Sequence, residues 1–303
     1  MGLEYYKKEL GEIPEFLEKY INVPSLQRLK KIGYFCGMDY ASKNIYQFKE
    51  YISRYDHSLT VALLCYKLTK DKNTTLAGLF HDISTPCFSH VIDYMNHDYE
   101  KQESTEKYTE KILREDKYLK KCLEIDQLPV EDITQFKKYT IVDNERPKLC
   151  ADRLDGIILT SIGWTKNITD EEIKEVMNGI EEEINEYKEK EIGFKEEKIA
   201  ASIVKKSEMI NDYCHSKEDN YMMNLLSIIT KQGLKDFLFR YKDLYYLTEE
   251  ELFDILKKSN NSQIKELLEI FSTIKKEDIP EIELGNIKKR DINPLIKCKR
   301  MTR

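Results

Sequence analysis

The sequence has few of the residues that interrupt helices, with only 11 glycines and 7 prolines among 303 residues. It has no long Gly/Ser/Pro linker and no repeat period, which excludes repeat arrays and domains joined by flexible linkers. Runs of alternating β-branched residues, which are typical of strands, are also absent. These absences predict an all-α fold.

Other absences restrict the compartment and the partners. The seven cysteines include no C-x-x-C pair, so we expect free thiols and no disulfide framework. No apolar run approaches the roughly 18 to 20 residues that span a bilayer, and the first residues lack the apolar region of a signal peptide. A net charge of −6 is unlike that of a general nucleic-acid binder, whose affinity comes from neutralising phosphates. We therefore expect a cytoplasmic protein with no membrane contact, and a small anionic substrate remains compatible.

Amphipathic patterns predict the individual helices. Thr169 and Glu172 form a capping box, and the apolar residues that follow at helical spacing predict one surface helix over residues 169–191. Thr248 and Glu251 predict the start of another helix in the same way. A further helical stripe is expected in the core and comprises Met222, Leu225, Leu226 and Ile229.

The chain is interpreted as three segments. Residues 1–162 would form a metal-binding core, residues 163–285 a helical extension packed on it, and residues 286–303 a basic tail. The basic side chains of this tail, with Asp291 as their acidic neighbour, are Lys288, Lys289, Arg290, Lys297, Lys299, Arg300 and Arg303. Such a tail could contact substrate, a neighbouring subunit or solvent, and a solvated tail is expected.

Histidine is scarce but clustered, because four of the five histidines lie between residues 57 and 97. The candidate metal ligands are two imidazoles and two carboxylates, namely His57, His81, Asp82 and Asp152. Such a set suits one divalent metal ion, which could be Fe, Mn, Zn, Ni or Mg. Helices expected over residues 58–68, 74–83 and 148–159 would bring these ligands to one centre of a bundle.

Four segments repeat the pattern of a known family. They contain Arg-x-x-His-Ser, His-Asp, Phe-Ser-His and Asp-x-x-Asp, and they lie at residues 53–59, 80–83, 87–93 and 151–155. Together they resemble the HD-domain metal-dependent phosphohydrolases, and most closely the deoxynucleoside triphosphate triphosphohydrolase branch. Residues 26–33, 244–256 and 289–294 also look like that branch, so the similarity covers most of the chain.

The resemblance implies roles for individual residues. It implies an HD-domain helical bundle with additional C-terminal helices, in which the metal is held by His57, His81, Asp82 and Asp152. Arg54 and Arg153 would contact substrate phosphate, for which a guanidinium fork is suited. His90 and Asp93 would be catalytic, with Asp93 orienting the imidazole. A helix cap or a core position is the alternative for His90.

The chain departs from the branch at several positions. Ser84-Thr85 stands in place of Gly-His, Thr105 in place of a later His, Gly156 in place of Tyr, and Thr160-Ser161 in place of Arg-Asp. His97 either substitutes for a missing imidazole or is a surface residue, and His215 is interpreted as structural or exposed. A pocket for deoxyribose and triphosphate is therefore not implied, although metal-dependent hydrolysis is.

We therefore expect a phosphohydrolase that acts on a nucleotide or another small phosphate ester, with metal-activated water as the nucleophile. One alternative is a monophosphatase or cyclic-nucleotide phosphodiesterase rather than a triphosphohydrolase. Another is a nucleotide-binding sensor or regulatory HD protein with little or no hydrolysis. A homo-oligomer is possible in each case.

Overall fold

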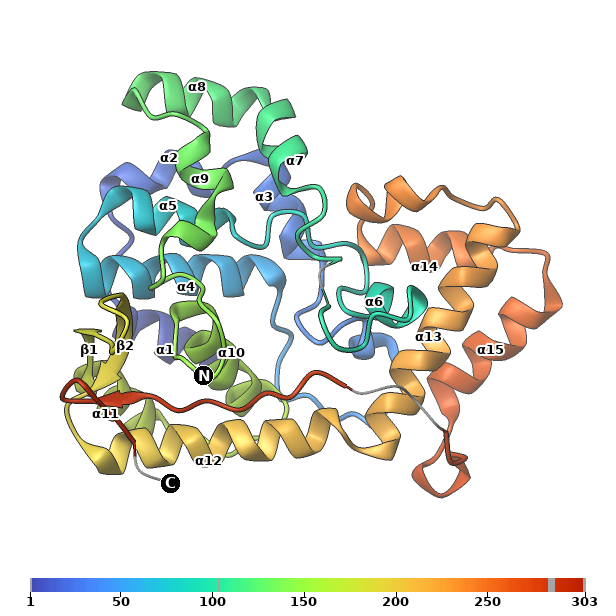
Figure 1. The fold of residues 1–303 in the computed structure, drawn as a ribbon. Helices are drawn as coiled ribbons and strands as arrows, with labels where there is room; N and C mark the ends of the chain where they lie inside the picture. The colour runs from blue at the N-terminus through green and yellow to red at the C-terminus, as the bar shows by residue number, and fades with distance from the viewer. Residues whose placement is uncertain (1, 103, 283–286, 302–303) are drawn as a thin grey trace.

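The all-α prediction is confirmed by the computed structural model, which describes residues 2–102, 104–282 and 287–301. Helices make up most of the molecule, and one small sheet lies at its edge (Figure 1). None of the described helices is long and apolar enough to cross a membrane. The segment boundaries at residues 162 and 285 stay predictions.

The first half of the chain forms the body that carries the predicted ligands. Its helices are α1 (Gly2–Leu10), α2 (Glu18–Ile21), α3 (Pro24–Arg28), α4 (Arg54–Thr69), α5 (Lys72–Phe80), α6 (Val91–Met95), α7 (Thr109–Glu115), α8 (Lys117–Asp126), α9 (Glu131–Thr134) and α10 (Ala151–Gly163). Short 3₁₀ turns among them are η1 (Glu15–Leu17), η2 (Leu29–Lys31), η3 (Met38–Tyr40) and η4 (Phe136–Lys138).

Local signals set the ends of the two central helices. A capping box between Ser53 and Asp56 begins α4. The left-handed Lys70 ends it, and Asp71 then caps α5 by accepting a hydrogen bond of 2.7 Å from the Thr74 backbone N–H. The helix α5 ends at Phe80 rather than at residue 83, so the predicted His-Asp pair lies in the turn that follows it.

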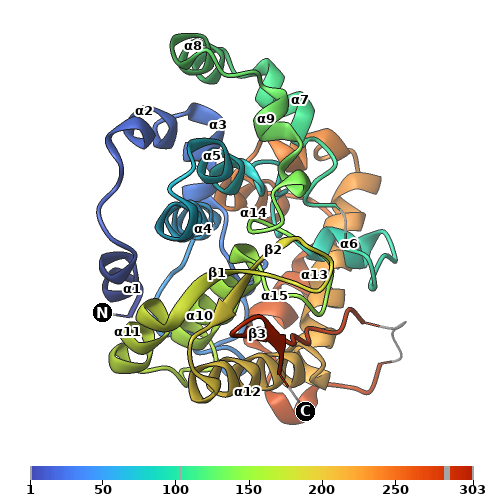
Figure 2. The same ribbon diagram turned by 60° about the vertical axis from the view of Figure 1, so that its left-hand side comes forward.

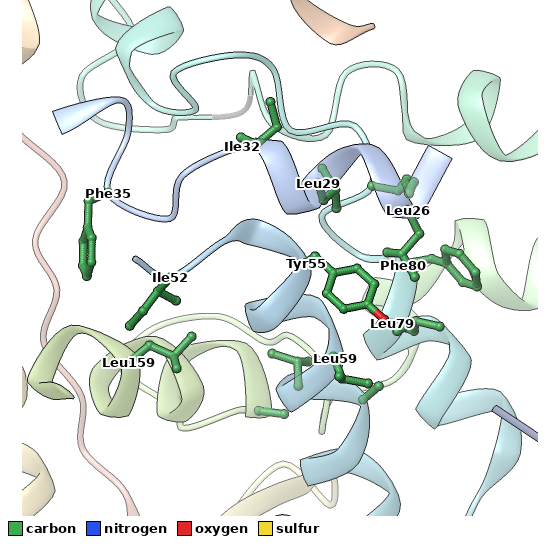
Figure 3. Close-up of a cluster of buried hydrophobic side chains, with 14 of the residues drawn as sticks. Leu26, Leu29, Ile32, Phe35, Ile52, Tyr55, Leu59, Leu79, Phe80 and Leu159 are labelled. Carbon is green, nitrogen blue, oxygen red and sulfur yellow. The ribbon is translucent and has the colours of Figure 1, made fainter. Parts of the chain in front are cut away.

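A shared apolar core holds these helices together. Figure 3 shows side chains of α4 between those of α3, α5 and α10, including Leu26, Tyr55, Leu59, Phe80 and Leu159. Most of these side chains are almost completely buried, so the helix ends that carry polar ligands are held in fixed relative positions.

The second half adds helices α11 (Asp170–Gly179), α12 (Glu197–Cys214), α13 (Lys217–Lys235), α14 (Glu249–Lys257) and α15 (Ser262–Thr273), with turns η5 (Tyr241–Tyr245) and η6 (Lys276–Asp278). The predicted capping box of Thr248 and Glu251 begins α14. The stripe predicted from Met222 to Ile229 is buried on α13, which packs against α6 and α15. Both predictions are confirmed.

The prediction of one helix over residues 169–191 is wrong beyond Gly179, where α11 ends. The chain then forms a hairpin of β1 (Ile180–Ile184) and β2 (Lys190–Phe194). The Asn185 side chain stabilises its turn by accepting hydrogen bonds of 2.9 Å from the backbone N–H groups of Tyr187 and Glu189. Two strands from the end of the chain complete the sheet in the order β1-β2-β3-β4, namely β3 (Leu295–Ile296), parallel to β2, and β4 (Lys299–Arg300), antiparallel to β3 (Figure 2).

The expectation of a solvated tail is also wrong for residues 287–301, which we call the C-terminal strap. In Figure 1 the strap follows α12 toward the sheet. Its backbone is bound along this path: Lys288 N–H donates to Tyr99 O at 3.0 Å, Arg290 N–H to Asn211 Oδ1 at 3.0 Å, and Asn293 N–H to Pro147 O at 2.7 Å. Residues 286, 302 and 303 of the predicted tail lie outside the described residues. Counting basic residues could not reveal these backbone contacts.

Candidate metal centre

The ends of three helices bring the predicted metal ligands together. His57 lies in the first turn of α4, His81 caps the end of α5, and Asp152 lies in the first turn of α10. Asp152 Oδ1 is 3.1 Å from His57 Nε2 and 3.6 Å from His81 Nε2. These three residues offer ligand atoms that all lie within 4.8 Å of one another. The fourth predicted ligand, Asp82, has its Oδ2 3.8 Å from His57 Nε2.

Both imidazoles are oriented by a hydrogen bond on the side away from this centre. His81 Nδ1 lies 2.7 Å from the Gly78 carbonyl oxygen, and His57 Nδ1 lies 2.7 Å from Asp155 Oδ2. A carbonyl can only accept, so His81 Nδ1 carries the proton and Nε2 keeps its lone pair. This is the outer arrangement that metal-binding histidines usually have.

Two further properties of the site fit a cation. His81 Nε2 is buried and has no hydrogen-bond partner among the described atoms, so its lone pair is unused. Burial lowers the pKa of His57, but its hydrogen bonds with Asp152 and Asp155 outweigh burial and raise that pKa to about 10. The neighbouring imidazoles of His57 and His81, acting against burial, hold the pKa of Asp152 well below its usual range. The carboxylates therefore favour positive charge at this point, and a divalent ion would supply it.

Asp155 is a functional residue to which sequence reasoning gave no role. It is completely buried on α10 and holds His57 through one oxygen while the other accepts a hydrogen bond of 2.7 Å from the Tyr6 hydroxyl. The signal was its place three residues after Asp152, because this spacing puts both carboxylates on one face of a helix.

A second cluster shares Asp152 and adds Asp143 and Cys150 within 4.8 Å. Burial raises the pKa of the Cys150 thiol to about 12, which keeps it protonated. Asp143 lies 3.4 Å from Arg153 Nη1 and already has a cationic partner. This cluster is therefore less suited to a metal than the one with two imidazoles.

Arg54 lies beside the centre. Its Nη1 donates to Asp82 Oδ2 at 2.9 Å and its Nε donates to Ser89 Oγ at 3.2 Å, while its guanidinium carbon lies 4.9 Å from the centre of the Tyr34 ring. The second predicted phosphate contact, Arg153, has its Nε 2.9 Å from the Lys148 carbonyl oxygen and so braces the loop before α10. Phosphate binding by either arginine stays a prediction.

His90 and Asp93 form a hydrogen-bonded pair, and His90 lines a cavity that the predicted metal ligands also line. Their Nδ1 and Oδ2 atoms are 2.9 Å apart, and the other oxygen of Asp93 accepts from the Ser104 backbone N–H at 2.9 Å. Burial lowers the pKa of His90, and the nearby charges of Arg54 and Arg290 add to this effect against the opposing effect of Asp93. His90 is thus held as a neutral imidazole that can accept a proton.

A cavity of about 530 Å³ is lined by His90, Arg54 and the predicted metal ligands. Aromatic residues also line this cavity: the rings of Phe35 and Phe48 stack at 4.3 Å, and Trp164 lies 6.2 Å from Phe48. Gly156 stands where the triphosphohydrolase branch has a tyrosine. A Cβ atom added at Gly156 would lie 2.9 Å from the Tyr34 hydroxyl, so Tyr34 fills the space beside this position. Tyr34 comes from a distant part of the chain, so the sequence motifs could not show that it lies here.

The remaining histidines lie apart from the described cavity lining. His97 Nδ1 contacts the Tyr99 hydroxyl at 3.1 Å in an exposed loop, so the structure gives it no place as a substitute imidazole. His215 is near the surface, and its Nδ1 contacts Asn211 O at 2.7 Å. Thr105, which stands where the triphosphohydrolase branch has a histidine, lines the cavity. Its backbone carbonyl accepts a hydrogen bond from Ser84 Oγ.

Comparisons with known proteins agree with this geometry. Residues 54–138 match the HD domain family. Over 147 residues the chain is 33% identical to the uncharacterised protein YdhJ of Bacillus subtilis strain 168, and the match covers 46% of this chain and 41% of that relative. The chain thus matches about two fifths of the length of that protein. The proposed resemblance to the deoxynucleoside triphosphate branch is not confirmed by these matches, and Asp152 lies beyond the matched domain. The chain contains an HD domain at residues 54–138.

Proposed function

We propose that the chain is a metal-dependent phosphohydrolase that acts on a nucleotide or another small phosphate ester. One observation carries the proposal: two oriented imidazoles and a carboxylate converge at the wall of a cavity, and one imidazole lone pair there has no partner. HD domains are usually hydrolytic and bind divalent metals. A volume of about 530 Å³ is in the range for small-molecule ligands.

The residues that would hold the metal are His57, His81, Asp82 and Asp152. This set of nitrogen and oxygen donors suits Fe(II), Mn(II), Zn(II), Ni(II) or Mg(II). When bound, such an ion polarises a phosphoryl oxygen and lowers the pKa of a coordinated water.

Two neighbours would act on the substrate. Arg54 would place positive charge beside a phosphoryl group while its bond to Asp82 keeps the guanidinium in position. His90, held by Asp93, would accept a proton from an attacking water or give one to a leaving oxygen.

A binding protein without hydrolysis is the second candidate. It is favoured by Thr105, which lines the cavity at a position where the resembling branch has a histidine. The pair of His90 and Asp93 favours the enzyme, because a sensor has no need of a neutral imidazole fixed by a buried carboxylate.

The test combines metal analysis with a phosphate-release screen. Purified protein should lose metal and activity together after mild chelation, and the products from nucleotides and other esters should be separated as triphosphate or orthophosphate. His81→Ala and Asp152→Ala should lose metal, whereas His215→Ala, which removes a surface imidazole, should keep it. Full metal stoichiometry in the first two variants would contradict the site, and metal binding without any released phosphate would favour the sensor.

A further inference from the structure

The C-terminal strap adds positive charge to the cavity that contains the metal centre. Lys288 and Arg290 of the strap line this cavity, together with Arg146 from the loop before α10. Arg290 is close enough to the catalytic pair for its charge to act on His90. The three cations therefore face the same space as the proposed reaction.

These cations lack carboxylate partners among the described residues. Arg146 Nη1 donates to the Asp291 carbonyl oxygen at 3.3 Å, and Lys288 Nζ donates to the Lys101 carbonyl oxygen at 3.0 Å. Arg290 Nε is buried and has no hydrogen-bond partner there. Elsewhere on the strap, by contrast, Arg300 Nη2 donates to Glu191 Oε2 at 2.7 Å.

Other carboxylates face this cavity, but among the described residues none forms an ion pair with the three cations. The charge of Arg290 acts on Asp219, yet burial raises the pKa of Asp219 to about 7. Glu106, also in the cavity lining, pairs with Lys137 at 2.6 Å, and Asp143 lies near Arg153. Burial and then repulsion by Arg290 lower the pKa of Arg146 to about 10, and they outweigh the attraction of Asp152. The same two causes lower the pKa of Lys288 against the same attraction. Like charges crowded into a partly buried space are unfavourable unless an anion joins them.

We propose that Arg146, Lys288 and Arg290 form an anion subsite that binds a second phosphoryl group of the substrate, apart from the group at the metal centre. The substrate is then a compound with at least two phosphoryl groups, such as a nucleoside di- or triphosphate. This assignment of substrate class rests on the proposed function, whereas the subsite itself can be tested by binding alone. Guanidinium forks suit phosphate oxygens, and two of the three cations are arginines.

The test measures binding of inorganic tripolyphosphate and of orthophosphate to the metal-containing protein by calorimetry. Arg290→Gln and Lys288→Gln should each raise the Kd for tripolyphosphate by about tenfold or more, as expected when a charge-assisted hydrogen bond is lost. The Kd for orthophosphate, which can occupy the metal centre alone, should change much less. Lys289→Gln is the matched control, because it removes the same charge from an exposed neighbour on the strap.

Arg146→Gln separates loss of the subsite from detachment of the strap. Arg146 belongs to another segment, and its substitution removes only one long hydrogen bond to the strap, at the Asp291 carbonyl oxygen. The strap keeps its backbone contacts, such as that between Arg290 N–H and Asn211. Arg146→Gln should therefore raise the Kd for tripolyphosphate in the same way, while the resistance of the strap to limited proteolysis stays unchanged. Tripolyphosphate binding that is equal in all variants and in Lys289→Gln would overturn the proposal, as would equal weakening of both anions.

The outcome also separates this inference from the proposed function. If the variants selectively lose tripolyphosphate but no ester is hydrolysed, the subsite stands and the proposed hydrolysis fails. If esters are hydrolysed and Arg290→Gln leaves kcat/KM unchanged for di- and triphosphates, the hydrolysis stands and the subsite is refuted.

Discussion

Asp155→Asn should weaken metal binding without removing any proposed ligand. Asp155 holds His57 Nδ1 at 2.7 Å and accepts from the Tyr6 hydroxyl at 2.7 Å, so both of its oxygens receive a proton donor. An asparagine has only one acceptor oxygen. Its amide would therefore either face the Tyr6 hydroxyl or donate to His57 Nδ1, and the second case moves the imidazole proton to Nε2, where it blocks coordination.

The expected loss of metal affinity is about 10- to 100-fold, which corresponds to about 1.4 to 2.7 kcal/mol. A chelator competition assay measures it, with elemental analysis of the metal bound. Tyr6→Phe is the control, because it removes the other partner of Asp155 but leaves the contact with His57. It should cost about 1 kcal/mol of the free energy of unfolding and keep the metal affinity.

The result that would refute this reasoning is a folded Asp155→Asn protein with wild-type metal affinity. Circular dichroism and a thermal melt establish that the variant is folded. If Tyr6→Phe lost as much affinity as Asp155→Asn, the effect would come from general loosening of α1 rather than from the orientation of His57.

The remaining predictions concern the cavity. His90→Ala should lower kcat by about 100-fold or more with metal content unchanged, and Asp93→Asn should lower it less; near-normal turnover of His90→Ala would leave metal-bound water as the sole activated group. Because the pKa of His90 is held below its usual value, kcat/KM should fall only as pH drops below about 6.5, and that acid limb should vanish in His90→Ala. Arg54→Ala should raise KM, and it should also lower Tm because it leaves the buried Asp82 without its ion-pair partner, whereas an unchanged KM with a lower Tm would make Arg54 structural only. Burial raises the pKa of Asp219 to about 7 against the hydrogen bond from Tyr46, so its contribution to stability is complete below pH about 4 and is lost as pH rises through about 7. Asp219→Asn should remove this slope and stabilise the protein at pH 8 by up to about 4 kcal/mol in urea unfolding, and an unaltered pH profile would show that Asp219 titrates normally.

Local sequence signals predicted much of the helical body. Capping boxes at Thr169 and Thr248 and the apolar periodicity of α13 are properties of a few neighbouring residues, so they survive folding unchanged. The order of His57, the His-Asp pair and Asp152 predicted which side chains converge, and three of these four residues provide the cluster within 4.8 Å.

The errors occur where distant segments decide the structure. Residues 180–187 carry apolar side chains at helical spacing, yet they form a hairpin whose second strand pairs with the C-terminal strap. The buried Glu191 of that hairpin is tolerated because Arg300 neutralises it from a position 109 residues later. Gly179, after Asn178, was the one local sign that the helix stops there.

The place of Trp164 makes the cavity optically observable. Trp164 is the single tryptophan of the chain, and it lines the cavity with its ring 6.2 Å from Phe48 and 5.5 Å from Tyr213. Indole emission depends on the polarity around the ring. Because the chain has one tryptophan, excitation near the red edge of indole absorption reports on the surroundings of Trp164 alone. Ligand binding in the cavity can therefore be followed by the change in Trp164 emission without a label, and candidate ligands can be ranked by affinity before any reaction is known.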